Sequence, residues 1–340
     1  MNGHDRILAA LEGRKPDRVP VMLHNFMMAA REDGATMKEF RGDPRLIAHA
    51  FIRAAEKYHV DGILVDIDTA TLAGAAGAEV DFPEDEPARV RSGCLGRLED
   101  ADGLGKVDLG SDRRVNIWLE SVRLISEHFR GELMVRGNCD QAPFSLASML
   151  RSPGEWLMDL VDREKEQRVF RLLEHSSGIT RQFIRLMAGT GAHMTSNGDS
   201  PAGPELISPV LYRKFALPYE REVVREAKAA GMPYVLHICG NTGLILKDML
   251  STGADGLELD HRTNIKLAHT LMKDRCTFFG NIDPVGVLAF GTPAAVEKRT
   301  HTLLEMFSDT PRFVLNAGCA IPAVTPPENL QAMIETARKY

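Results

Sequence analysis

The sequence predicts a single (β/α)8 TIM barrel, and two observations support this fold class. Short segments rich in β-branched residues alternate with longer segments whose apolar residues recur at helical spacing, and the alternation repeats eight times. The length of 340 residues also fits one large barrel. An open doubly wound sheet is the alternative, but no G-x-G-x-x-G motif follows the first strand. The closed barrel is therefore favoured.

The elements follow in order along the chain. An amphipathic helix is predicted at residues 3–13, and further helices include 46–58, 210–230 and 294–307, several of which begin at a Ser, Thr or Asp followed by Pro. The predicted strands span residues 19–24, 62–68, 133–138, 193–199, 234–239, 256–260, 277–283 and 313–319. Residues 79–118 interrupt the alternation, because they are rich in Pro, Gly, Asp and Glu. We expect an elaborated loop or small hairpin there, after strand two, within one domain that spans residues 1–340.

Composition excludes two classes of partner. The chain has 41 basic and 47 acidic residues, a formal net charge of −6 and no Lys/Arg run, so we expect no binding to nucleic acid. It contains no apolar stretch of roughly 18 residues that would cross a bilayer, and its beginning lacks the apolar core of a signal peptide. We therefore expect a cytoplasmic protein without a membrane partner. The oligomeric state stays open between a monomer and a homodimer.

Polar residues stand at the carboxyl end of every predicted strand, which is where a barrel carries its active site. Asp and Asn also cap helices and anchor loops, so only part of this set is expected to meet a substrate. The pattern nevertheless favours an enzyme over a structural protein. The residues expected to line a substrate pocket are His24, Asn25, Asp66, Asp68, Asn197, Asp199 and Asn281.

The fifth and eighth predicted strands suggest a metal site. Because side chains alternate along a strand, His237 and Cys239 project to the same side, about 7 Å apart along the chain. Cys319 ends the eighth strand, across the barrel mouth. Two thiolates and one imidazole suit zinc and leave a fourth position open. Chance pairing and buried cysteines in the core are the alternative, and Cys139, also at a strand end, is a competing ligand.

Longer motifs resemble the uroporphyrinogen decarboxylase superfamily over nearly the whole chain. They are Arg6–Leu11, Asp17–Val21, His237-Ile238-Cys239-Gly240, Gly280–Pro284 and Gly318–Pro322. Two departures separate the chain from the decarboxylases themselves. Where those enzymes carry Met-Arg-Gln-Ala-Gly-Arg, this chain has the arginine-free stretch 22–27, and it has Cys319 in place of a His. Both departures resemble the zinc methyltransferases that work with corrinoid proteins.

This resemblance implies a function and roles for individual residues. His237, Cys239 and Cys319 would hold one zinc ion, and Asp260, or Glu258 in its place, would be an additional, displaceable ligand. A methyl group would move between a corrinoid and a small substrate, with a methoxylated aromatic favoured over a methylamine or a thiol. The chain has no Asp-x-His-x-x-Gly motif, so the cobalamin is expected on a separate corrinoid protein that docks at the barrel mouth.

Two other functions stay open at this point. The first is decarboxylation of a porphyrinogen-like acid without metal, which the missing arginines of the first strand disfavour because carboxylates would lack counter-charges. The second is a non-catalytic protein that binds corrinoid or zinc, which the polar strand ends disfavour.

Overall fold

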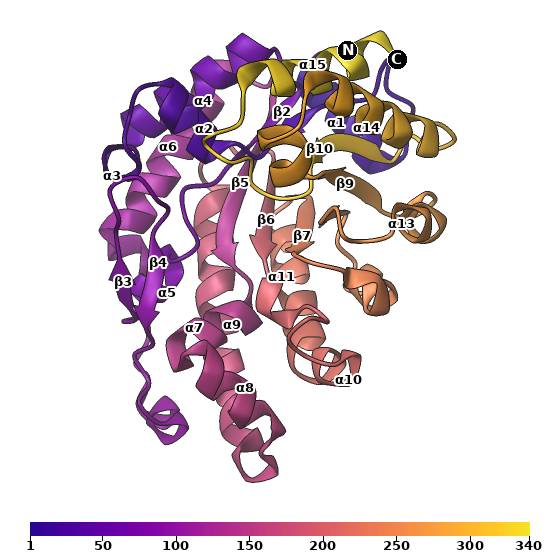
Figure 1. Ribbon diagram of the computed structural model, residues 1–340. Coiled ribbons are helices and arrows are strands. Elements are labelled where there is room, and N and C mark those ends of the chain that lie inside the picture. The colour runs from indigo at the N-terminus through magenta and orange to yellow at the C-terminus, as the bar shows by residue number, and fades with distance from the viewer.

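The computed structural model of the protein describes residues 1–340 and contains a barrel of eight parallel strands in chain order (Figure 1). The strands are β1 Met22–Leu23, β2 Gly62–Val65, β5 Met134–Gln141, β6 Met194–Gly198, β7 Tyr234–Ile238, β8 Gly256–Leu259, β9 Thr277–Ile282 and β10 Phe313–Ala317. The first and last strands meet where Val21 bridges Leu315 in parallel, and the Leu315 N–H donates to the Pro20 carbonyl at 2.9 Å. The predicted closed barrel is thus confirmed and the open sheet is excluded.

Helices surround this barrel on its outside (Figure 1). They are α1 Gly3–Glu12, α2 Phe26–Glu32, α3 Met37–Phe40, α4 Pro44–Tyr58, α5 Thr71–Ala75, α6 Arg113–Phe129, α7 Pro143–Arg151, α8 Pro153–Val161, α9 Glu166–Ala188, α10 Pro209–Leu211, α11 Leu217–Ala229, α12 Leu246–Leu250, α13 Ile265–Met272, α14 Pro293–Met306 and α15 Pro327–Lys339. A π-helical turn, η5 Tyr212–Ala216, joins α10 to α11 within the long helix predicted at 210–230. None of these helices combines the length and the apolar character that crossing a membrane requires.

The interior of the barrel has an apolar layer near the amino ends of the strands. Helix α1 contributes Ile7, Ala10 and Leu11 to this layer, which closes that end of the barrel. The strand residues of the layer are Met22, Met134, Met194, Val235, Phe279 and Val314. A much larger apolar cluster fills the space between the strands and the outer helices. Burial of this kind stabilises the fold by about 25 cal/mol per Å² of apolar surface. The opposite end, at the carboxyl ends of the strands, is left for polar residues.

The segment expected at 79–118 forms a small antiparallel hairpin followed by two short 3-10 turns. The hairpin consists of β3 Glu79–Asp81 and β4 Arg89–Ser92. Helix α6 begins at Arg113, so the irregular segment ends before the expected residue 118. Asp112 marks this start, since its carboxylate accepts hydrogen bonds from the N–H groups of Arg114 and Val115.

Candidate metal centre

Three side chains meet at the carboxyl ends of β7 and β10. His237 is the penultimate residue of β7 and Cys239 follows the strand, while Cys319 follows β10. The His237 Nε2 lies 3.0 Å from the Cys239 Sγ, and the two Sγ atoms of Cys239 and Cys319 lie 3.8 Å apart. The three potential ligand atoms all lie within 4.8 Å of one another. The structure thus brings together the three residues that the sequence singled out.

Two glycines allow the backbone to turn and approach closely beside these thiols. Gly240, directly after Cys239, has a φ of 84°, which an L side chain rarely adopts. Gly318, directly before Cys319, packs against the end of β8, where an added Cβ would lie 2.7 Å from the backbone nitrogen of His261. Cys319 therefore reaches its position because a residue without a side chain precedes it.

The spacing of the two sulfurs fits a tetrahedral zinc ion. With Zn–S distances of about 2.3 Å and Zn–N distances of about 2.0–2.1 Å, tetrahedral geometry separates two sulfurs by about 3.8 Å, and a sulfur from a nitrogen by about 3.6 Å. The Sγ atoms of Cys239 and Cys319 are 3.8 Å apart, as this geometry requires. The His237 Nε2 and the Cys239 Sγ are 3.0 Å apart, which is shorter than the tetrahedral value. Cys239 and Cys319 are only partly buried, so a fourth position would be open toward the barrel mouth.

Hydrogen bonds and charges prepare these groups for metal binding. The Nδ1–H of His237 donates to the backbone carbonyl of Glu258 at 3.0 Å, which leaves Nε2 free to bind a metal. The hydrogen bond from Cys319 and the nearby His237 lower the pKa of the Cys239 thiol to about 3, against the opposing effect of burial. The same hydrogen bond and burial raise the pKa of Cys319. These interactions favour the thiolate form of Cys239, which is the form that binds a metal.

A buried polar network adjoins the three candidate ligands. Glu258, which lies opposite His237 in the parallel register of β7 and β8, forms an ion pair with Arg136 of β5. One oxygen of Glu258 lies 3.8 Å from the His237 Nδ1 and 3.4 Å from the Nδ1 of His24. The His24 Nε2 in turn lies 2.9 Å from an oxygen of Asp66. His24, Asp66 and Glu258 therefore share one buried chain of contacts that ends at the candidate metal centre.

Asp260 lies beside this cluster but its carboxylate holds the neighbouring loops. One oxygen accepts from the N–H of Gly240 at 2.9 Å, and the other accepts from the N–H of Arg262 at 2.9 Å. These hydrogen bonds and the Arg262 side chain lower the pKa of Asp260 against the opposing effect of burial. Asp260 thus stabilises the turn that carries Cys239, while Glu258 is the carboxylate with an oxygen near His237.

The other residues expected at a substrate pocket fall into two groups. Some keep polar atoms without a partner, and the others are hydrogen-bonded within the protein. Asn25 and Asn281 are buried and keep amide atoms without a hydrogen-bond partner, as a ligand-facing residue would. Asn197 bonds to the Cys139 carbonyl and to the Tyr234 hydroxyl, and so braces the strands. Asp199 accepts from Ser145, and Asp68 accepts from the start of α5. The side chains of Asn197, Asp199 and Asp68 thus form hydrogen bonds within the protein.

One residue of the buried polar network was not predicted from the sequence, and one predicted alternative metal ligand lies away from the candidate metal centre. Arg136, whose guanidinium is sealed inside the barrel, was not singled out, although a lone arginine within a predicted buried strand requires a partner. Cys139, weighed as a competing ligand, is buried with its Sγ 3.1 Å from the Thr195 hydroxyl and lies outside the metal-binding group.

Comparisons with known proteins agree with this architecture. The profile of the family described as Uroporphyrinogen decarboxylase (URO-D) matches residues 2–340. The chain is similar to the methylcobamide:CoM methyltransferase MtbA of Methanosarcina acetivorans, with 30% identity over 99% of this chain and 97% of that protein. It is also similar to a uroporphyrinogen decarboxylase of Alkalilimnicola ehrlichii, with 28% identity over 98% of this chain and 93% of that protein.

A solved structure shows the same fold. The methyltransferase from Methanosarcina mazei superposes with a TM-score of 0.91 at 24% identity, covering 100% of this chain and 99% of that one. Together with the family match over almost every residue, the comparisons confirm the resemblance found in the sequence motifs. The chain belongs to the uroporphyrinogen decarboxylase (URO-D) family.

Proposed function

We propose that this protein is a zinc-dependent methyltransferase that moves a methyl group between a corrinoid and a small substrate. The observation that supports it most directly is the approach of His237 Nε2, Cys239 Sγ and Cys319 Sγ to within 4.8 Å of one another at the barrel mouth. Relatives named methylcobamide:CoM methyltransferases align with almost the whole chain, which supports the same class of reaction here.

The residues of the chain have separate roles in this proposal. A zinc ion held there would lower the pKa of a thiol substrate or polarise the heteroatom of a methyl donor. The Glu258 carbonyl fixes the His237 ring in the tautomer that presents Nε2. Glu258 itself, fixed by Arg136, is the carboxylate that we propose as the additional ligand in preference to Asp260, because both oxygens of Asp260 already accept hydrogen bonds from the backbone N–H groups of Gly240 and Arg262.

We infer that the small substrate is a thiol rather than a methoxylated aromatic or a methylamine. The similar methyltransferases are named for CoM, which is a thiol, and no relative supports the aromatic substrate favoured from the sequence. His24 lies next to Glu258 and Asp66 lies next to His24, and these are the polar groups that we propose contact such a substrate. Asn25 and Asn281, with unpaired buried amide atoms, complete the proposed pocket.

Decarboxylation is the weaker proposal, although relatives with that name match the chain. The stretch 22–27, Met-Leu-His-Asn-Phe-Met, offers no arginine to a substrate that carries carboxylates. Arg136 lies inside the barrel but is already paired with Glu258. Arg136, the cation next to the candidate metal centre, is therefore not free to bind a polycarboxylate.

A separate corrinoid protein is the proposed partner at the barrel mouth. Large apolar side chains stand exposed on the loops that follow β6, β7, β9 and β10, on the same side of the barrel as the three candidate metal ligands. They are Leu206, Val210, Leu244, Val285, Phe290 and Val324. Exposed apolar groups gathered on one face are typical of a protein–protein contact.

Metal content and methyl transfer, measured on the same preparations, test this proposal. We expect about one zinc per chain by elemental analysis, and transfer from methylcobalamin to a thiol followed through the cobalamin absorbance. Cys239→Ser and Cys319→Ser should each lose zinc and transfer together. Cys94→Ser is the matched control, because this exposed cysteine lies outside the metal-binding group.

Three results would contradict the proposal in different ways. A metal-free preparation with full transfer would exclude zinc, and a zinc-loaded protein inert toward methylcobalamin with every thiol or methylated compound would leave only a binding role. Loss of zinc in Cys94→Ser as well would show that the losses reflect misfolding rather than removal of a ligand.

A further inference from the structure

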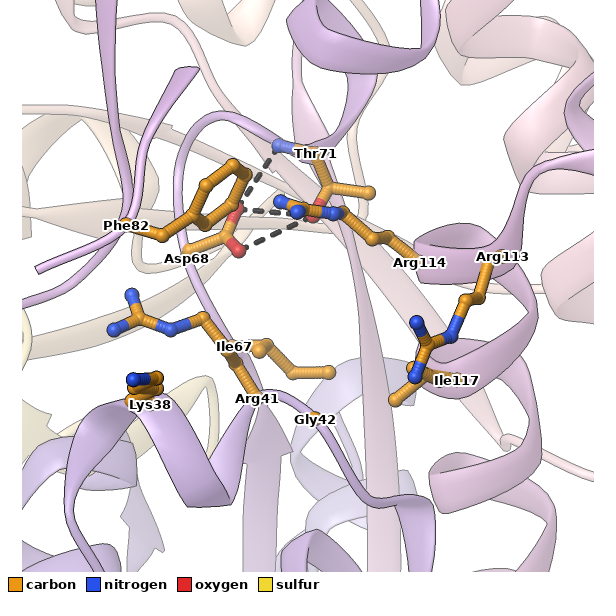
Figure 2. Close-up of a pocket in the computed structure, with 10 residues that line it drawn as sticks. All are labelled: Lys38, Arg41, Gly42, Ile67, Asp68, Thr71, Phe82, Arg113, Arg114 and Ile117. Carbon is orange, nitrogen blue, oxygen red and sulfur yellow. Dashed lines mark hydrogen bonds between the residues drawn. The ribbon is translucent and has the colours of Figure 1, made fainter. Parts of the chain in front are cut away.

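A cavity of about 350 Å³ lies beside the carboxyl end of β2 and is lined in part by the loop that joins β3 to β4 (Figure 2). Its walls come from four elements that are distant in sequence. Helix α3 and the residue after it supply Lys38 and Arg41, the start of α6 supplies Arg113 and Arg114, and the hairpin supplies Phe82. Asp68, just beyond the end of β2, forms part of the floor. None of these residues belongs to the candidate metal centre.

The four cations of this cavity lack carboxylate partners. None of them forms an ion pair within 4.0 Å, although acidic residues are plentiful in the hairpin. Asp81 and Glu86 of the hairpin pair instead with Arg89, at 3.1 Å and 2.9 Å. Burial lowers the pKa of Arg41 and of Arg114, and repulsion from a neighbouring arginine contributes in the same direction. The site therefore presents an uncompensated positive surface.

The geometry of the two arginines is fixed by the hairpin. Arg41 donates to the backbone carbonyls of Pro83 and Glu86, and its guanidinium carbon lies 5.8 Å from the centre of the Phe82 ring. The guanidinium carbon of Arg114 lies 3.3 Å from the same centre, stacked on the ring (Figure 2). Stacking on an aromatic face orients a guanidinium while leaving its N–H edge free to donate.

Asp68 does not neutralise this cluster. Its two oxygens accept hydrogen bonds from the N–H groups of Ala70 and Thr71 and from the Thr71 hydroxyl, which turns the carboxylate toward the start of α5 (Figure 2). Asp81 and Asp112 also lie near Arg41 and Arg114, but none of these carboxylates comes within 4.0 Å of the four cations to form an ion pair. A ligand with several negative charges would balance them.

We propose that this cavity binds a small molecule through a multiply charged phosphate group, held by Lys38, Arg41, Arg113 and Arg114, with an organic portion against Phe82. A planar guanidinium group can donate two parallel hydrogen bonds to a pair of phosphate oxygens. A single carboxylate carries only one negative charge, which is too little to balance four cations. The site is separate from the metal centre, and its existence does not depend on methyl transfer.

Calorimetric titration of the full-length protein with inorganic pyrophosphate at low ionic strength tests this proposal. The double variant Lys38→Gln/Arg113→Gln removes the two cations that make no hydrogen bond or ion pair with the protein, so its fold is not expected to change. We expect the dissociation constant to rise by about tenfold, since each exposed charge contact contributes up to about 1 kcal/mol. Raising the salt concentration should also weaken the binding of pyrophosphate to the wild-type protein, because salt screens the attraction between charges.

A control and a competing ligand make the result decisive. Arg225→Gln removes an exposed charge from α11, far along the chain from the cavity, and should leave the dissociation constant unchanged. Absence of binding at millimolar pyrophosphate, or equal binding by the double variant, would overturn the site. Tighter binding of citrate than of pyrophosphate would overturn the assignment to phosphate.

Discussion

Arg136 and Glu258 show at the scale of single residues how a charge inside the barrel supports the candidate metal centre. Each side chain is about 1% exposed, so neither charge is solvated by bulk water. Burial alone would raise the pKa of Glu258, but the charge of Arg136 and the contact with His24, 3.4 Å away, keep it well below its usual range. A buried carboxylate of this kind is retained only because its cation is fixed beside it.

Arg136→Met removes that cation while keeping an unbranched side chain of comparable length. We expect the free energy of unfolding to fall by about 3–5 kcal/mol, because the charge of Glu258 is left buried and unpaired. Urea unfolding measures the loss, and Arg225→Met on the exposed face of α11 should cost far less. The double variant Arg136→Met/Glu258→Gln should recover much of the stability. A double variant no more stable than Arg136→Met would contradict this account.

At the scale of elements, the close approach of β10 to β8 determines where Cys319 stands. Gly318→Ala would place a Cβ 2.7 Å from the backbone nitrogen of His261 and 3.2 Å from the carbonyl carbon of Asp260. The neighbouring atoms belong to the backbone, which cannot move aside as the end of a flexible side chain can. The end of β10 must therefore shift. We expect zinc affinity to fall by about tenfold or more, as for other changes that misplace a ligand. Competition with a chelator measures this affinity.

Gly154→Ala is the matched control for that experiment. An added Cβ at Gly154, in α8, meets no atom within 4 Å, and alanine is favoured in a helix. Zinc affinity and stability should therefore be kept or slightly improved. Equal zinc affinity in Gly318→Ala and the wild type would show that the end of β10 tolerates the extra atom, and that the position of Cys319 does not depend on Gly318.

The sequence contains enough information to predict the strands, because each buried parallel strand is a short apolar segment between helical patterns. Side-chain alternation likewise predicted that His237 and Cys239 share a face. The partners of individual carboxylates could not be predicted, since Asp68 and Asp199 bind groups whose positions depend on loop geometry. The pairing of Arg136 with Glu258 joins strands 122 positions apart in sequence, and only the closed barrel brings them together.

At the scale of the whole molecule, a buried pair of acids links the barrel to its outer helices. Asp199 follows β6 and accepts from the Ser145 N–H and hydroxyl of α7 at 2.8 Å and 2.6 Å. Glu220 of α11 accepts from the Tyr212 hydroxyl and lies close enough to Asp199 for the two acids to influence each other's ionisation. Burial raises the pKa of Asp199 to about 6 and that of Glu220 well above its usual value. Both shifts favour retention of a proton by the pair in the folded protein.

This retained proton makes the stability of the fold depend on pH in a direction that can be worked out. Above about pH 4.5 an unfolded glutamate has lost its proton, whereas folded Glu220 keeps it, so the free energy of unfolding falls as pH rises, by about 1.4 kcal/mol per pH unit. Glu220→Gln mimics the protonated acid and cannot titrate. Between pH 5 and pH 7, urea unfolding should therefore show the variant gaining about 1–3 kcal/mol relative to the wild type. Glu297→Gln, on the exposed face of α14, should show no such gain. If Glu220→Gln and the wild type changed with pH in parallel, the acid pair would be ionised in the folded protein, and its two charges would have to be balanced by groups other than Ser145 and Tyr212.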